Sequence, residues 1–193
     1  MDFLNLNKPK NTLTPAVGRL LIAEPFLGDA NFARSVVLLC EHGEDGTIGF
    51  ILNRSTELSL GDLLPDIDTP GLVIYQGGPV QMDTLHMLHK MPEVLGGNEI
   101  FPGIYWGGSY EALQDIVASG NIDPGTLRLF VGYSGWSPGQ LDKEMEEGSW
   151  VVANLVPDLL FKTSPQEVWK EAIKSLGSYY AYLANMPLNP QLN

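Results

Sequence analysis

SVVLLCEHGEDGTIGFILNR, which spans residues 35–54, is the stretch of sequence that decides the expected fold. Residues 35–42 form a mostly apolar run that includes β-branched side chains, which is typical of a largely buried strand. Residues 47–54 have the same character, and the Asp45-Gly46 pair between the two runs favours a tight turn. The stretch therefore predicts a β-hairpin near the start of the chain.

Strands and helices surround this hairpin in mixed order, without the regular alternation of a doubly wound sheet. We expect further strands at 19–24, 72–76, 84–91, 104–108 and 150–156, and one at 126–136 that runs into a glycine-bounded turn. We expect helices at 59–66, 109–120, 137–148 and 164–177, each starting at a serine in the N-cap position. This order predicts an α+β fold with a mixed or barrel-like sheet.

The length of 193 residues fits one domain, which we place at 17–193, after a flexible N-terminal arm at 1–16. The chain has 11 basic and 23 acidic residues, a net charge of −12. Such a charge repels nucleic-acid phosphates and anionic lipid, and the basic residues are spread along the chain without a cluster. We therefore expect neither direct nucleic-acid binding nor membrane association.

The single cysteine, Cys40, excludes an intramolecular disulfide and fits a reducing compartment. The N-terminus does not resemble a secretory signal, and no apolar run approaches the roughly 20 residues of a membrane span. The sequence therefore predicts a cytoplasmic protein.

Cys40 and His42 are the first candidate catalytic pair. Residues two apart on a strand point to the same side, so the imidazole of His42 would favour the Cys40 thiolate. Val36 and Leu38 share that side, however, and free cysteine is among the most buried residue types. From the residues alone, a thiol that fills the core is the favoured interpretation.

Two glycine-rich motifs are candidates for a ligand site. Gly77-Gly78 ends a strand and could present backbone N–H groups to an anion, although a tight turn is the simpler interpretation. The run 132–136, GYSGW, partly matches the G-x-S-x-G elbow of serine hydrolases. Trp136 replaces the last glycine and every histidine precedes Ser134, so we favour a turn whose glycines allow close packing.

The pair His86 and His89 does not predict a metal site. On a strand these two residues face opposite sides, and no cluster of further metal-binding residue types accompanies them. A structural or surface histidine is the better interpretation of each. We expect no metal and no cofactor.

Several of these segments together resemble the AlgH-like (YqgE) family of small bacterial proteins, over nearly the whole chain after the arm. The resemblance implies a bifurcated sheet that contains a small barrel-like core surrounded by helices, and it implies no established biochemical activity. Some members are labelled transcriptional regulators. The family's motif cysteine corresponds to Cys40, and Ser134 stands where a residue such as alanine is common. The segments that carry the resemblance are 18–23, 40–42, 46–54, 76–80, 132–136 and 139–141.

Three functional hypotheses follow, and no complete catalytic constellation supports an enzyme. The first is a non-catalytic regulatory or ligand-binding protein that binds an unknown small molecule or protein partner. The second is a thiol-dependent enzyme or redox sensor that uses Cys40, and the third is a transcriptional regulator that acts indirectly or through DNA. The candidate ligand-binding residues are Asn53, Arg54, Gly77, Gly78, Gly132, Ser134, Gly135, Trp136 and Gln140.

Overall fold

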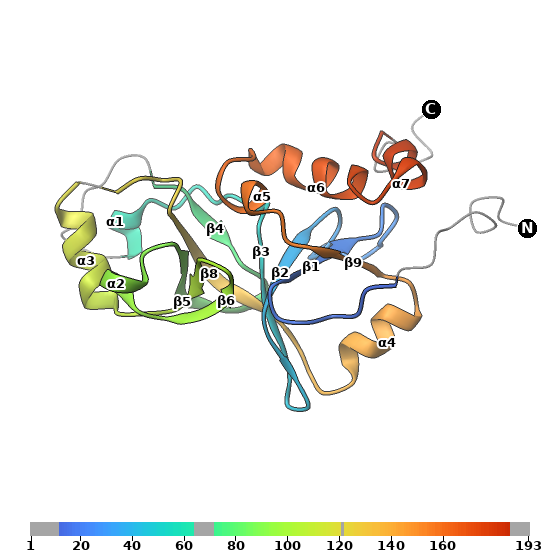
Figure 1. Cartoon of the computed structure of the whole chain (residues 1–193), viewed down its shortest axis with the longest axis horizontal. Helices are drawn as coiled ribbons and strands as arrows, with labels where there is room; N and C mark the ends of the chain where they lie inside the picture. Colours follow the sequence, from blue (N-terminus) through green and yellow to red (C-terminus); the bar gives the residue numbers. More distant parts are fainter. Residues whose placement is uncertain (1–11, 64–71, 121, 186–193) are drawn as a thin grey trace, which may run out of the picture.

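A computed structural model of the protein describes residues 12–63, 72–120 and 122–185. Within these residues nine strands form one sheet, and helices pack against it from several sides (Figure 1). The α+β class expected from the sequence is confirmed. The strands are β1 Arg19–Ala23, β2 Val36–Gly43, β3 Gly46–Ile51, β4 Ile74–Gln76, β5 Val80–His89, β6 Asn98–Phe101, β7 Ile104–Trp106, β8 Leu127–Trp136 and β9 Trp150–Asn154. The helices are α1 Leu60–Leu63, α2 Pro92–Leu95, α3 Tyr110–Ala118, α4 Gln140–Glu146, α5 Pro157–Phe161, α6 Pro165–Lys174 and α7 Ser178–Leu183.

The expected hairpin is confirmed. Strands β2 and β3 pair antiparallel, with Val37 opposite Ile51 and His42 opposite Thr47. The ladder shifts register between Leu39 and Glu41, so β2 contains a bulge. The long tip of this hairpin projects from the body at the bottom of Figure 1.

Strand β8 is the point at which the sheet branches. It pairs with β5 over much of its length, with β4 in parallel at Leu129–Val131, and with β3 antiparallel at Ser134–Trp136. The main path runs β6-β7-β5-β8-β3-β2-β1-β9. The sheet is therefore mixed and branched, with a single parallel pair among the described strands.

The prediction of a barrel-like core, from the sequence and from the resemblance, is wrong, because the sheet does not close on itself. Its described end strands are β6 and β9, and no ladder joins them. The loop before β1 approaches β6, where the carbonyl of Ile100 lies against Gly18. That contact is loop packing rather than strand pairing, so the sheet stays open at this edge.

The helix starts follow the capping signals in part. The hydroxyl of Ser109 accepts a hydrogen bond from the N–H of Ala112 at 3.1 Å, as a cap should. Helix α4 begins at Gln140, three residues later than expected, because Gly139 takes a left-handed conformation at the N-cap. The side chain of Gln140 still accepts from the N–H of Ser137 at 3.0 Å. Within the described ranges no helix has the length and apolarity needed to cross a membrane.

The alternation of side chains along the strands divides the core. Val36 and Leu38 face the group of apolar side chains that α5, α6 and α7 cover. Val37 and Leu39 face a second group that α4 covers from the other side (Figure 1). A third group lies between β4, β5 and β8 and the helices α1, α2 and α3.

Some elements differ from the expectation. Strand β6 and the short helices α2 and α5 were not predicted, and residues 132–136 continue β8 as a strand instead of forming a turn. The end of the expected helix at 59–66 and most of the expected arm at 1–16 lie outside the described residues. The single domain expected at 17–193 stays a prediction.

Candidate functional site

Cys40 lies inside the hydrocarbon core. Its side chain is 5% exposed and packs in the same apolar group as Val36 and Leu38. The thiol makes a long contact of 3.8 Å to the carbonyl of Leu38. Burial raises the pKa of the Cys40 thiol well above its ordinary value, because a buried thiolate is poorly solvated. The environment is that of a structural cysteine rather than of a nucleophile.

His42 does not form the expected pair with Cys40. The shared side rested on an unbroken two-residue period, and the bulge between Leu39 and Glu41 interrupts that period. Across the hairpin, Nδ1 of His42 bonds the hydroxyl of Thr47 at 2.7 Å. The imidazole thus stabilises the hairpin tip. His42 is therefore not placed to act as a general base for the Cys40 thiol.

A folded protein should therefore protect Cys40 from alkylation. We expect iodoacetamide at neutral pH to label native Cys40 at least about a hundredfold more slowly than the urea-unfolded chain, since labelling requires opening of the core. Mass spectrometry of quenched time points measures both rates, with Cys40→Ser as the unlabelled control. Rapid stoichiometric labelling of the native protein would contradict this expectation, if the pH dependence of the labelling rate gave a thiol pKa below the ordinary value.

The motif glycines Gly77, Gly78 and Gly132 come together with Ser134, where β4 ends against β8. The backbone of Gly77 donates to the carbonyl of Val131 at 2.9 Å, and the hydroxyl of Ser134 donates to the carbonyl of Gly77 at 2.9 Å. A Cβ atom on Gly132 would lie 2.8 Å from the carbonyl oxygen of Val80 and 2.9 Å from that of Gly78. Backbone fills this crossing, so these residues serve close packing and leave no room for a ligand.

Trp136 and Gln140 belong to a polar cluster under α4. The indole N–H groups of Trp136 and Trp150 both donate to Oε2 of Glu144 at 2.8 Å. The amide of Gln140 donates to Oε1 of the same carboxylate at 3.0 Å. The ring of Phe32 contacts both indoles, with centroid distances of 5.8 and 5.3 Å. These hydrogen bonds engage the side chain of Gln140 within the protein.

Gly135 and Trp136 also line a cavity of about 380 Å³ between the hairpin tip and the start of α4. The carboxylates of Glu41 and Asp45 stand at its wall beside the hydroxyl-bearing Tyr133. The cavity therefore lacks a cation that could attract an anionic ligand.

The two strand histidines have structural environments. His89 is fully buried, with Nε2 bonded to the carbonyl of Gly107 at 2.9 Å and Nδ1 accepting from the N–H of Met91 at 3.1 Å. His86 bonds Thr84 at 2.9 Å, and burial lowers the pKa of its imidazole. Among the residues with described positions, no group of three or more His, Cys, Asp and Glu could hold a metal ion.

Asn53 lies in the loop after β3 and joins that loop to the segment before β2. Its Oδ1 accepts from the N–H of Val36 at 3.0 Å, and its Nδ2 donates to the carbonyl of Arg34 at 2.9 Å. Arg34 has a left-handed backbone with a φ of 51°, which is uncommon for a residue other than glycine. The amide of Asn53 thus holds Arg34 in a conformation that the residue would not prefer alone.

A cationic cleft lies beside this corner. Arg34, Arg54 and Lys170 of α6 line a cavity of about 290 Å³, together with Trp169. The guanidinium of Arg34 lies 4.8 Å from the centre of the Trp169 ring, and Arg54 donates to the carbonyl of Ala30 at 3.1 Å. Burial lowers the pKa of both arginines, although arginine keeps its charge in proteins.

Asn53 and Arg54 of the candidate ligand-binding residues line this cleft, whereas Arg34 and Lys170 were not among the candidates. The basic residues are scattered along the chain, as we noted, yet the fold gathers three of the eleven around one cleft. No spacing rule connects a loop before β2 to the middle of α6. The unusual backbone of Arg34 carries no sequence signal either.

Comparisons with known proteins agree on one family. The family model described as AlgH-like matches residues 20–181. The UPF0301 protein CT0663 of Chlorobaculum tepidum is 42% identical over 177 residues, covering 91% of this chain and 95% of the relative. A UPF0301 protein of Cytophaga hutchinsonii is 38% identical over 178 residues, covering 91% and 98%.

Two solved structures are similar to this fold. The solution structure of the AlgH protein from Pseudomonas aeruginosa has a TM-score of 0.72 at 30% identity, covering 92% of this chain and 98% of that one. The crystal structure of DIP2367 from Corynebacterium diphtheriae has a TM-score of 0.76 at 23% identity, covering 95% and 97%.

Proposed function

This chain belongs to the AlgH-like family, and from that premise we propose that it is a non-catalytic protein that binds an anionic small molecule in the cleft of Arg34, Arg54 and Lys170. The observation that supports this most is the distribution of charge. In a chain of net charge −12, three of eleven basic residues surround one concave site. Clefts of one charge sign focus the field and attract ligands of the opposite sign.

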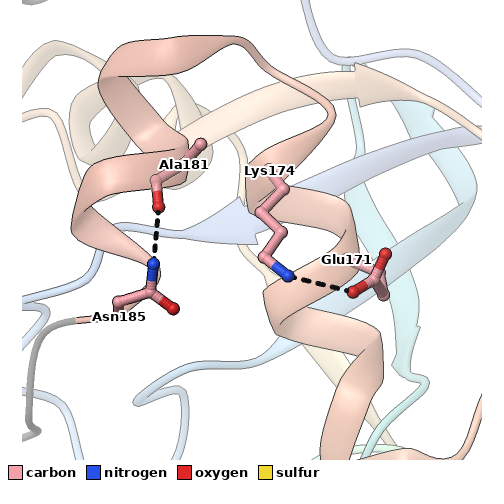
Figure 2. Close-up of polar contacts among 4 residues, drawn as sticks. All are labelled: Glu171, Lys174, Ala181 and Asn185. Carbon is pink, nitrogen blue, oxygen red and sulfur yellow. Dashed lines mark hydrogen bonds and ion pairs between the residues drawn. The ribbon is translucent and has the colours of Figure 1, made fainter.

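Lys170 contributes most directly, because its ammonium forms no ion pair within 4.0 Å among the described residues. Lys174, one turn further along α6, differs in this respect. Its Nζ lies 3.3 Å from Oε1 of Glu171, and Figure 2 shows the pair beside the contact of Asn185 with Ala181. Lys174 is therefore a natural control, since it has the same charge and helix but a local partner.

Arg54 supplies the second cation. The carboxylate of Asp29 acts on it electrostatically, which offsets part of the effect of burial on its pKa. No ion pair within 4.0 Å joins the two within the part of the chain that the structure describes. A guanidinium in this state keeps donors for a second acceptor, and its fork geometry suits phosphate and carboxylate oxygens.

Pyrophosphate is a suitable probe of this proposal. We expect the double variant Arg54→Gln/Lys170→Gln to bind it at least about tenfold more weakly, since each hydrogen bond to a charged group contributes roughly 1.5–3 kcal/mol. Isothermal titration calorimetry at fixed ionic strength measures the affinity. Lys174→Gln should stay within about twofold of the wild-type protein. Equal binding by the double variant, or no binding by the wild-type protein, would refute the proposal.

A regulatory role and a cytoplasmic location are part of the same proposal. Because the residues that the structure describes present no aligned nucleophile and base, the protein would act through the complex that it forms with its ligand. The acidic charge argues against contact with DNA, so an effect on transcription would be indirect. The single, buried cysteine fits a reducing compartment.

A further inference from the structure

A third cavity lies next to the cationic cleft, at the start of α6. It has a volume of about 240 Å³ and is lined by Tyr75 of β4, Arg128 of β8 and the segment 161–165. Pro165 forms part of the wall of both this cavity and the cationic cleft. The two sites are therefore neighbours, but their cations are different residues.

Arg128 is the unusual residue of this cavity, because its charge is buried without a carboxylate. The side chain is 7% exposed, and its guanidinium lies 4.2 Å from the centre of the Tyr75 ring. Nη1 donates to the carbonyl of Leu52 at 3.1 Å. Among the described residues no carboxylate lies within ion-pairing distance of it.

Burying a charge of this kind lowers the stability of a protein unless a counter-charge lies beside it. The carbonyl of Leu52 and the face of Tyr75 stabilise the guanidinium in part, because both present negative potential. Burial nevertheless lowers the pKa of Arg128, so the protein groups do not replace the lost hydration completely. A guanidinium carries five N–H donors, and the bond to the carbonyl of Leu52 leaves others for a ligand.

The rim of the cavity offers further donors. Ser164 takes the N-cap position of α6, yet its side chain makes no capping hydrogen bond. Lys162 extends at the edge, where its ammonium contacts Asp158 at 3.0 Å in an exposed pair that contributes little to stability. An anion beside Arg128 would meet the positive end of the α6 dipole and a free hydroxyl.

We infer that this cavity binds a small anionic group, a phosphate or a carboxylate, with Arg128 as its counter-charge. The volume lies below the roughly 300–1,000 Å³ of sites for drug-sized ligands, so the cavity suits a small ligand. The planar fork of Arg128 recognises two oxygens of the same group. This inference does not depend on the neighbouring cleft, because no cation is shared.

Inorganic phosphate and acetate, each titrated into the full-length protein at constant ionic strength, distinguish the two chemistries. The side-chain Nε–H resonance of Arg128 should shift and saturate with the anion that binds. Its assignment comes from the signal that disappears in Arg128→Lys. A resonance that stays in place under both anions would overturn the inference.

Thermal unfolding supplies the second readout. The anion should raise the melting temperature of the wild-type protein, and Arg128→Met should lose this rise relative to its own melting temperature without anion. The variant Arg54→Gln/Lys170→Gln should keep the rise, which separates this site from the cleft. A full rise in Arg128→Met would overturn the inference, whereas loss of the rise only in the double variant would assign the anion to the cleft.

Discussion

Gly78→Ala should prevent the protein from reaching its native fold. A methyl group at this position would overlap the carbonyl of Tyr133 and the backbone nitrogen of Ser134, where β4 ends against β8. Neither contact is the flexible end of a side chain, so the two chain segments would have to separate. We expect a loss of more than about 4 kcal/mol, a large share of the roughly 5–15 kcal/mol that stabilises a domain.

Circular dichroism and the yield of soluble protein measure this effect, and Gly43→Ala is its control. Gly43 lies near the tip of the β2–β3 hairpin, with no atom within 4 Å of an added Cβ. Its substitution should change the free energy of unfolding by less than about 0.5 kcal/mol, as is usual at the surface. A Gly78→Ala protein that melts within a few degrees of the wild-type protein would show that the crossing can relax.

The sequence indicates that the backbone at Gly77 and Gly78 has a special conformational requirement, but it does not show which structural feature needs it. Paired glycines indicate that a backbone needs space or freedom, which fits a turn, an anion cradle or a chain crossing equally well. The neighbour that decides between them is the carbonyl of Gly132, far along the chain. Only the fold brings that carbonyl to Gly77.

Elements with strong local signals were predicted well. The hairpin of β2 and β3 carries its own turn, and α3 carries both its Ser109 cap and an apolar face. The end of β8 was mistaken for a turn because Gly132 and Gly135 weaken a strand locally. Pairing of Ser134–Trp136 with β3 overrides that preference. At the end of β8, tertiary contacts thus outweigh the local conformational preference of the residues.

Of the candidate ligand-binding residues named from the sequence, only Asn53 and Arg54 line the cationic cleft. A bulge displaced His42 from the side expected for Cys40, and the position of a bulge does not follow from alternation. Lys170 was visible only as one of several charges on a helix. Arg128 was not among the candidates, although a charged residue within the largely apolar strand β8 is itself a signal, because such residues are seldom buried without a partner.

Glu144→Leu should give the second large loss of stability, about 3 kcal/mol. The indole N–H groups of Trp136 and Trp150 converge on one oxygen of this carboxylate, and a leucine offers them no acceptor. Each buried donor left without a partner costs roughly 1–3 kcal/mol. Phe32 packs against both indoles, so the rings cannot easily turn toward water.

Urea unfolding followed by tryptophan fluorescence measures the loss, and Glu146→Leu is the matched control on the same helix. Glu146 is exposed and its side chain forms no hydrogen bond with the described residues, so its substitution should change stability by less than about 0.5 kcal/mol. Glu144→Gln should fall between the two, because its amide oxygen still accepts from both indoles but lacks the charge that strengthens both bonds. If Glu144→Leu proves as stable as Glu146→Leu, water reaches both indoles, and the cluster stabilises α4 through packing alone.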